Sequence, residues 1–127
     1  MWIALGGALG STLRYLAAVW MTQHFPGKIP YGTLTVNFVG SFSLCLLMIV
    51  LPSTGWSIEF RNGLTIGAMG GFTTYSTFNA EVLAALERGD FGVAIIYLML
   101  TLSGCLFGGW LGLGAGHHLA RTLSHLP

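Results

Sequence analysis

Four apolar stretches, each long enough to cross a lipid bilayer, constrain this chain more than any other feature of its sequence. About 20 apolar residues in a helix span the roughly 30 Å of hydrocarbon in a membrane. Only 7% of the 127 residues are charged and the mean hydropathy is +0.74, values that a soluble domain of this length does not normally show. The stretches cover residues 3–21, 31–51, 63–86 and 91–119, and the turns between them are short. The sequence therefore predicts an all-α membrane protein, with residues 1–127 forming a single domain of four transmembrane helices in the lipid bilayer of the cell membrane. No nucleic-acid partner is expected.

The third stretch is a poor helix. Residues 67–78 hold three glycines, four Ser or Thr residues and three aromatic residues. Glycine and threonine are weak helix formers, and a backbone that leaves helical geometry inside hydrocarbon is tolerated only where protein or a water-filled cavity receives the freed groups. We therefore expect this helix to be broken at mid-membrane, which indicates a permeation site.

The charges that normally set the orientation of a membrane protein are balanced here. With four spans, Arg61 and Arg121 lie on one side of the membrane, and Lys28 and Arg88 lie on the other. Because a chain without this bias can insert both ways, we expect a dual-topology antiparallel homodimer. The alternative is a single orientation, fixed by the insertion machinery or by Arg14.

Glycines at four-residue spacing predict close helix contacts. The fourth stretch carries four of them in register, and shorter repeats occur at Gly6 with Gly10 and at Gly67 with Gly71. Such a stripe lets another helix approach closely, either within a subunit or between subunits. The four in register are Gly104, Gly108, Gly112 and Gly116.

Polar residues follow one face of two of the predicted helices. Thr33, Asn37 and Ser41 are spaced by four residues on the second, and Tyr97 and Thr101 on the fourth. Interhelical hydrogen bonds are the simplest role for the hydroxyl groups. The Asn37 amide is costly in hydrocarbon and offers two N–H donors to an anion in a lumen.

Charged and aromatic residues favour an anion as the permeating species. Arg14 lies midway along the first stretch, where it either attracts an anion or pairs with Glu81 or with helix carbonyls. Tyr75 and Phe78 follow the expected break at three-residue spacing, with the hydroxyl of Thr77 between them, and the edge of an aromatic ring is positive. Donors and cations exceed acids in the interior, although freed carbonyls at residues 70–73 could hold a cation instead.

Three blocks of sequence resemble the signature blocks of the Fluc (CrcB-type) fluoride channels. They are GGALGSTLRY at residues 6–15, GTLTVNFVGSF at residues 32–42 and GGFTTYSTF at residues 70–78. The resemblance implies an antiparallel homodimer with two pores, each lined by both subunits, through which cytoplasmic fluoride leaves passively.

The resemblance also implies roles for individual residues. The aromatic pair would be Tyr75 and Phe78, and the pore amide would be Asn37. Arg14, Thr33 and Glu81 would lie at a vestibule near the pore, and a polar track would begin at Tyr97 and Thr101. Backbone carbonyls of Gly70 and Thr73 from both copies would hold a structural Na⁺ at the dimer centre. Tyr75 stands where the family usually has Phe, and Cys105 stands where some relatives have a pore serine.

Other functions are less well supported by the sequence. No ATP-binding motif, metal-ligand spacing or nucleophile–base pair is evident, so no enzyme activity is expected. A small dual-topology multidrug antiporter needs a carboxylate in its first helix, where this chain has Arg14. A non-conducting scaffold subunit would explain the glycine stripes without a pore.

Overall fold

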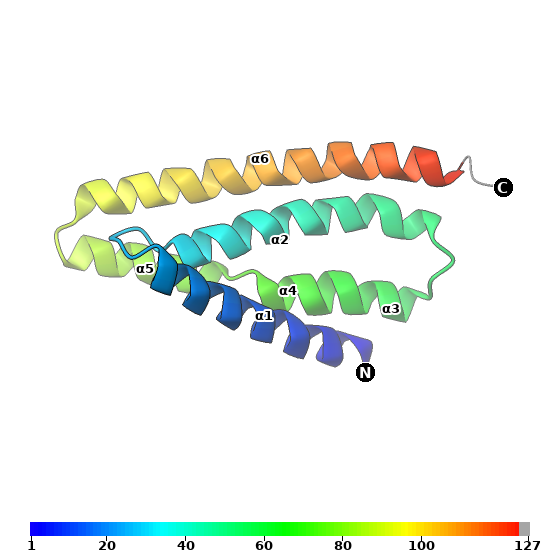
Figure 1. Cartoon of the computed structure of the whole chain (residues 1–127), viewed down its shortest axis with the longest axis horizontal. Helices are drawn as coiled ribbons and strands as arrows, with labels where there is room; N and C mark the ends of the chain where they lie inside the picture. Colours follow the sequence, from blue (N-terminus) through cyan, green and yellow to red (C-terminus); the bar gives the residue numbers. More distant parts are fainter. Residues whose placement is uncertain (125–127) are drawn as a thin grey trace.

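The computed structural model describes residues 1–124 and contains only helices over that range (Figure 1). The elements are α1 (Trp2–His24), α2 (Tyr31–Val50), the 3₁₀ turn η1 (Leu51–Ser53), α3 (Ile58–Asn62), the π-helix η2 (Gly63–Met69), α4 (Gly70–Phe72), α5 (Tyr75–Glu87) and α6 (Phe91–Ser124). Three spans are long and apolar enough to cross a membrane, namely Trp2–His24, Tyr31–Ser53 and Phe91–Leu123. The prediction of an all-α membrane protein is confirmed.

The segment between α2 and α6 is divided into several short helices. α3, η2 and α4 follow one another without a gap, but Thr73 and Thr74 have extended backbone angles, with ψ of 157° and 105°. α5 then begins at Tyr75, and Figure 1 shows the link between α4 and α5 as a thin extended strand of chain. The helical ladder of this segment is therefore interrupted at residues 73–74.

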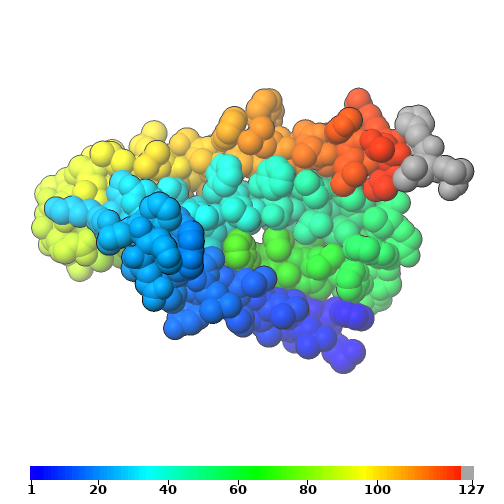
Figure 2. Space-filling view, viewed as in Figure 1, coloured from blue at the N-terminus to red at the C-terminus, as the bar shows by residue number. Residues whose placement is uncertain are grey.

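The chain runs back and forth along one long axis. In Figure 1 the N-terminus, the α2–α3 connection and the end of α6 lie at one end of the molecule, and the other two connections lie at the opposite end. At that opposite end the ion pair between Lys28 and Asp90, at 2.8 Å, joins the two turns, and Asp90 also contacts Arg88 of its own turn at 3.6 Å. Figure 2 shows a hollow near the middle, between the blue atoms of α1 and the cyan atoms of α2, with green atoms from the neighbourhood of the break.

The glycine stripe of α6 packs against α2 within the same subunit. A methyl group at Gly108 would lie 3.1 Å from the ring and the carbonyl oxygen of Phe38, and one at Gly116 would lie 2.9 Å from Ile49. At Gly112 it would collide with the carbonyl oxygen of Phe42. The stripe therefore lets the backbones of α2 and α6 touch, which decides the question that the sequence left open.

A second close contact joins α1 to η2 and α4. A side chain at Gly10 would collide with the carbonyl oxygen of Ala68, and one at Gly71 would lie 2.7 Å from that of Gly7. Gly6 meets Gly63 in the same way. Backbone contact with α1 thus holds η2 and α4 in place up to the residue where the helix stops.

Candidate functional site

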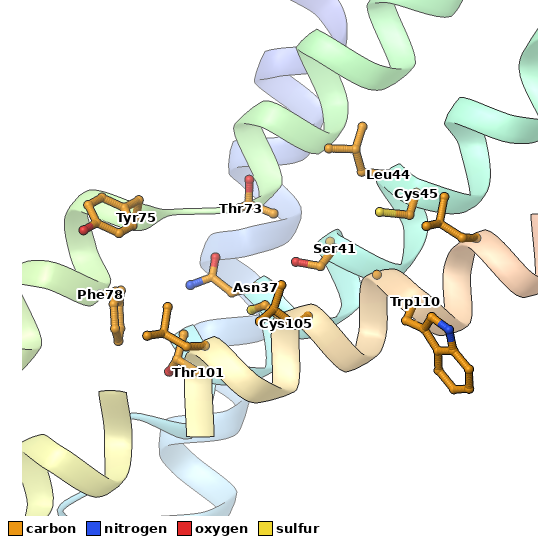
Figure 3. A pocket seen from close by; sticks show the side chains of 15 residues that line it. Asn37, Ser41, Leu44, Cys45, Thr73, Tyr75, Phe78, Thr101, Cys105 and Trp110 are labelled. Atoms are coloured by element: carbon orange, nitrogen blue, oxygen red, sulfur yellow. The ribbon is translucent and has the colours of Figure 1, made fainter. Parts of the chain in front are cut away.

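A cavity of about 630 Å³ lies beside the break, between α2, the start of α5 and α6 (Figure 3). Its lining is mainly apolar, with a few hydroxyl, amide and thiol groups among leucines and Trp110. Those groups belong to Asn37, Ser41, Cys45, Thr73, Tyr75, Thr101 and Cys105. An apolar cavity with a few convergent polar groups is the usual form of a small-ligand site.

Asn37 pairs with the backbone at the break. Its side-chain oxygen accepts a hydrogen bond from the Thr74 amide at 2.8 Å, and its side-chain nitrogen donates one to the Thr74 carbonyl at 3.1 Å. Asn37 is 8% exposed, so both bonds are shielded from solvent. The side-chain oxygen thus replaces the partner that the Thr74 amide loses by leaving the helix, and one of the two N–H groups of Asn37 remains for a ligand.

Thr74 in turn caps α5. Its hydroxyl oxygen accepts a hydrogen bond from the Thr77 amide at 3.3 Å and donates one to the Thr77 hydroxyl at 2.8 Å. This is the ordinary chemistry of a helix N-cap, where a side-chain oxygen satisfies an amide of the first turn. Thr77 is consequently part of the cap and does not line the cavity.

These side-chain bonds take two amides away from the main-chain ladder. In a continuous helix the Thr74 amide would bond to the Gly70 carbonyl, and the Thr77 amide would bond to the Thr73 carbonyl. Both amides donate to side chains instead. Gly70 is exposed, with open space where a Cβ would stand. The carbonyls of Gly70 and Thr73 are therefore suited to bind a cation, whereas no group of three His, Cys, Asp or Glu residues comes together within residues 1–124.

The two predicted aromatic residues lie next to each other but differ in exposure. The ring centroids of Tyr75 and Phe78 are 5.9 Å apart, and the rings are tilted by 58°. Phe78 is 6% exposed, whereas Tyr75 is 76% exposed. Phe78 also meets Tyr97 edge to face, with centroids 5.2 Å apart, so it separates the main cavity from the polar cluster described next.

Glu81 is the centre of that cluster. One carboxylate oxygen accepts a hydrogen bond from the Thr33 hydroxyl at 2.9 Å, and the other accepts one from the Tyr97 hydroxyl at 2.7 Å. A smaller cavity of about 190 Å³ opens beside Glu81 and Tyr97, and Lys28 and Arg88 contribute to its wall. Two hydroxyl donors thus fix the position of the Glu81 carboxylate, and the cationic side chains of Lys28 and Arg88 line the same small cavity.

Thr101 carries the one buried side-chain polar atom without a hydrogen-bond partner in the described part of the chain. The residue is 4% exposed, and it lines the main cavity one turn after Tyr97 on α6. A buried hydroxyl without a partner is costly, and native structures usually supply a partner, an ion or a water. The hydroxyl oxygen has almost no accessible surface, so it lies beside the cavity and not in its open space.

The structure brings most of the predicted site residues into two adjoining groups. Asn37, Tyr75, Phe78 and Thr101 line the main cavity, and Thr33, Glu81 and Tyr97 form the cluster beyond Phe78. Arg14 is half-buried on α1, and it makes no ion pair or side-chain hydrogen bond within residues 1–124. The suggested pair between Arg14 and Glu81 is not formed.

Sequence reasoning missed two features of the site. The paired bonds from Asn37 to Thr74 could not be foreseen, because they join residues 37 positions apart. The N-cap could have been found, because Thr74 precedes a helical pattern and Thr77 follows it by three residues.

Comparison with known proteins links this arrangement to one family. The family described as CrcB-like protein, camphor resistance (CrcB), matches residues 1–113. A protein of Geobacter metallireducens named fluoride-specific ion channel FluC is 46% identical over 118 residues, which are 92% of this chain and 95% of that protein. Proteins with the same name from Anaeromyxobacter sp. (strain K) and Sorangium cellulosum are 48% identical over 105 residues and 40% identical over 119 residues. These matches cover 82% and 93% of this chain, and 83% and 94% of those proteins.

Proposed function

The chain belongs to the CrcB family, and on that premise we propose that it is a fluoride-selective ion channel through which fluoride leaves the cytoplasm passively. Relatives of nearly the same length carry the name fluoride-specific ion channel. The protein is a multi-pass membrane protein, and its family consists of ion channels rather than enzymes.

The second N–H of Asn37 at the main cavity is the observation that carries the proposal. Fluoride has no hydrogen to donate and accepts hydrogen bonds strongly, so it would accept from this donor. Thr101 and the ring of Phe78 border the same cavity. Selective conduction requires groups that replace the hydration shell of an ion. They must bind the ion strongly enough to admit it and weakly enough to release it. A hydroxyl, an amide and a ring edge supply such a set without a fixed positive charge.

The cluster around Glu81 would form a second station. Thr33 and Tyr97 both donate to the carboxylate, so a fluoride ion arriving there would compete for the same donors. Lys28 and Arg88 would attract the anion to this end, and Arg14 would serve the vestibule at the other entrance. In this arrangement Thr77 contributes to the path indirectly, by capping the helix that presents Phe78.

An antiparallel dual-topology homodimer would complete the pores. Tyr75 is 76% exposed on a single subunit although it carries a polar hydroxyl, and the cavity beside it is open at the surface. A second copy would cover both and would give two pores, each lined by two subunits. The balance of Arg61 and Arg121 against Lys28 and Arg88 supports insertion in both directions.

A structural Na⁺ fits the backbone at the break. Residues 58–87 would form the fourth membrane crossing, with the break near mid-membrane. The carbonyls of Gly70 and Thr73 lack their usual amide partners and would be the protein ligands, because hard cations prefer oxygen. When bound, the ion would supply positive charge that holds the interrupted segments of two subunits together. Asn37 and Thr74 keep the break open for it.

The test is fluoride release from liposomes that contain only this protein. We expect rapid release of fluoride, negligible release of chloride and no dependence on a proton gradient. Thr101→Val and Phe78→Ile should each lower the fluoride rate at least tenfold while the dimer remains intact by crosslinking. Phe107→Ile is the matched control, because Phe107 is 54% exposed on α6 and lies outside the cavity. Wild-type rates in both cavity variants would refute the proposed pore.

A further inference from the structure

We propose that Asp90 sets the anion affinity at the mouth of the small cavity beside Glu81, because it holds the two cationic side chains there and offsets part of their charge. The inference rests on the proposed function and deepens it, since it names a residue that tunes the approach of fluoride to the second station. Lys28 and Arg88 line this cavity together with Glu81, whereas Asp90 stands outside its wall and pairs with both cations.

The turn between α5 and α6 fixes the position of Asp90. The Asp90 amide donates to the Ala85 carbonyl at 3.0 Å, and the amide of Gly89, which has a φ of 77°, donates to the Leu86 carbonyl at 2.9 Å. On the other side, the Asp90 carbonyl accepts a hydrogen bond from the Ala94 amide in the first turn of α6, at 3.0 Å. This backbone is therefore held from both helices, and it keeps the carboxylate within reach of the two cations.

The two oxygens of the Asp90 carboxylate face different cations. One lies 2.8 Å from Lys28 Nζ, in the turn between α1 and α2, and the other lies 3.6 Å from Arg88 Nε. The side chains of Lys28 and Arg88 are 71% and 58% exposed, and ion pairs as exposed as these contribute little to folding stability. Their larger effect is on the electrostatic field at the mouth, where Asp90 offsets one of two positive charges.

A carboxylate in this position competes with the permeating anion. Carboxylate oxygens and fluoride both accept hydrogen bonds from ammonium and guanidinium groups, so the pairs with Asp90 weaken the hold of the mouth on fluoride. Conduction requires such weak binding, because the ion must leave as well as enter. A unit charge about 7 Å away in water changes the local concentration of a monovalent anion roughly threefold. Salt suppresses this effect, since the Debye length falls from about 30 Å at 0.01 M to about 3 Å at 1 M.

The experiment measures initial fluoride release from phosphatidylcholine liposomes at subsaturating fluoride, with potassium gluconate at about 0.01 M or about 1 M on both sides of the membrane. In low salt, Asp90→Asn should raise the rate roughly twofold to threefold, and Lys28→Gln should lower it by a similar factor. The double variant has the net charge of the wild type, so its rate should return to the wild-type value. In high salt, all four proteins should release fluoride at the same rate.

The opposite signs of the two single variants distinguish an electrostatic role from a structural one. If the ion pair only joined the two turns, Asp90→Asn and Lys28→Gln would shift the rate in the same direction and the double variant would not recover, and the inference would be overturned. Equal rates for all four proteins in low salt would overturn it as well. A wild-type protein that releases no fluoride would give a different result, because the channel function itself would then be refuted, and the role of Asp90 with it.

Discussion

Replacement of Asn37 by alanine should destabilise the break between α4 and α5 before it affects any other part of the molecule. The Asn37 side chain is the partner of both the amide and the carbonyl of Thr74, at 2.8 and 3.1 Å. Alanine leaves the buried Thr74 amide without a partner, whereas the Thr74 carbonyl, at the N-cap of α5, still accepts the first hydrogen bond of that helix. The Thr74 amide can regain a partner only if the chain straightens into a continuous helix, which would move Tyr75 and the rest of α5.

The cost follows from the number of bonds lost. Each unsatisfied group costs about 1–2 kcal/mol, allowing for the modest value of hydrogen bonds inside membrane proteins. The one unsatisfied amide therefore lowers the stability against local opening by about 1–2 kcal/mol. Because each 1.4 kcal/mol is a factor of ten, hydrogen exchange at the Thr74 amide should accelerate by roughly 5-fold to 30-fold.

The assay is hydrogen exchange of the purified protein in detergent micelles, followed at peptides that contain Thr74, together with thermal unfolding. Ser41→Ala is the matched control. It removes a hydroxyl one turn further along the same face of α2 and in the same cavity, but it leaves the break capped. If exchange at Thr74 in Asn37→Ala equalled that of the control, the side chain would not be holding the break. In that case its role would have to lie in the cavity alone.

Two further outcomes follow from contacts elsewhere in the molecule. Gly112→Ala should lower the free energy of unfolding by about 1–3 kcal/mol, because the added methyl group would collide with the carbonyl oxygen of Phe42. The control is Gly114→Ala on the open side of α6, which should be neutral or stabilising. Equal melting temperatures for the two variants would refute the packing argument. The hydrogen bond from Lys28 lowers the pKa of Asp90 below its ordinary value of 3.8, so the ionised form is favoured in the folded protein. The resulting contribution to folding stability is present above pH 3.8 and is lost as the pH falls through the lowered pKa. Asp90→Asn should remove this part of the pH dependence from thermal unfolding curves.

The helices could be predicted largely from hydropathy. The apolar stretches predicted to begin at residues 31 and 91 coincide with the first residues of α2 and α6, since a turn precedes each. The helical structure before the break begins at Ile58, earlier than the apolar stretch, because the Ser57 hydroxyl caps it by accepting a hydrogen bond from the Phe60 amide. Capping is local chemistry that a hydropathy pattern does not register.

The sequence indicated on which helix faces some of the polar residues lie, but not the hydrogen bonds that they make. Asn37 and Thr101, which four-residue spacing places on polar faces of two helices, both line the main cavity. The sequence could not show that the Asn37 side chain forms hydrogen bonds with the backbone of Thr74, or that Glu81 accepts hydrogen bonds from residues on two other helices. These contacts depend on how the helices pack. Glycines such as Gly112 set the register of that packing. The sequence shows their four-residue spacing, but it does not show which residue of the neighbouring helix each glycine contacts.

The bonds from Asn37 to Thr74 have a consequence for how the protein is made. The ribosome releases α2 into the membrane before it releases the interrupted segment, so the side chain that compensates the gap is already in place when the gap arrives. A circular permutant that synthesises residues 58–87 first would deliver two extended threonines into lipid with nothing to receive their main-chain groups. The order in which the helices are synthesised thus helps the interrupted helix to insert into the membrane.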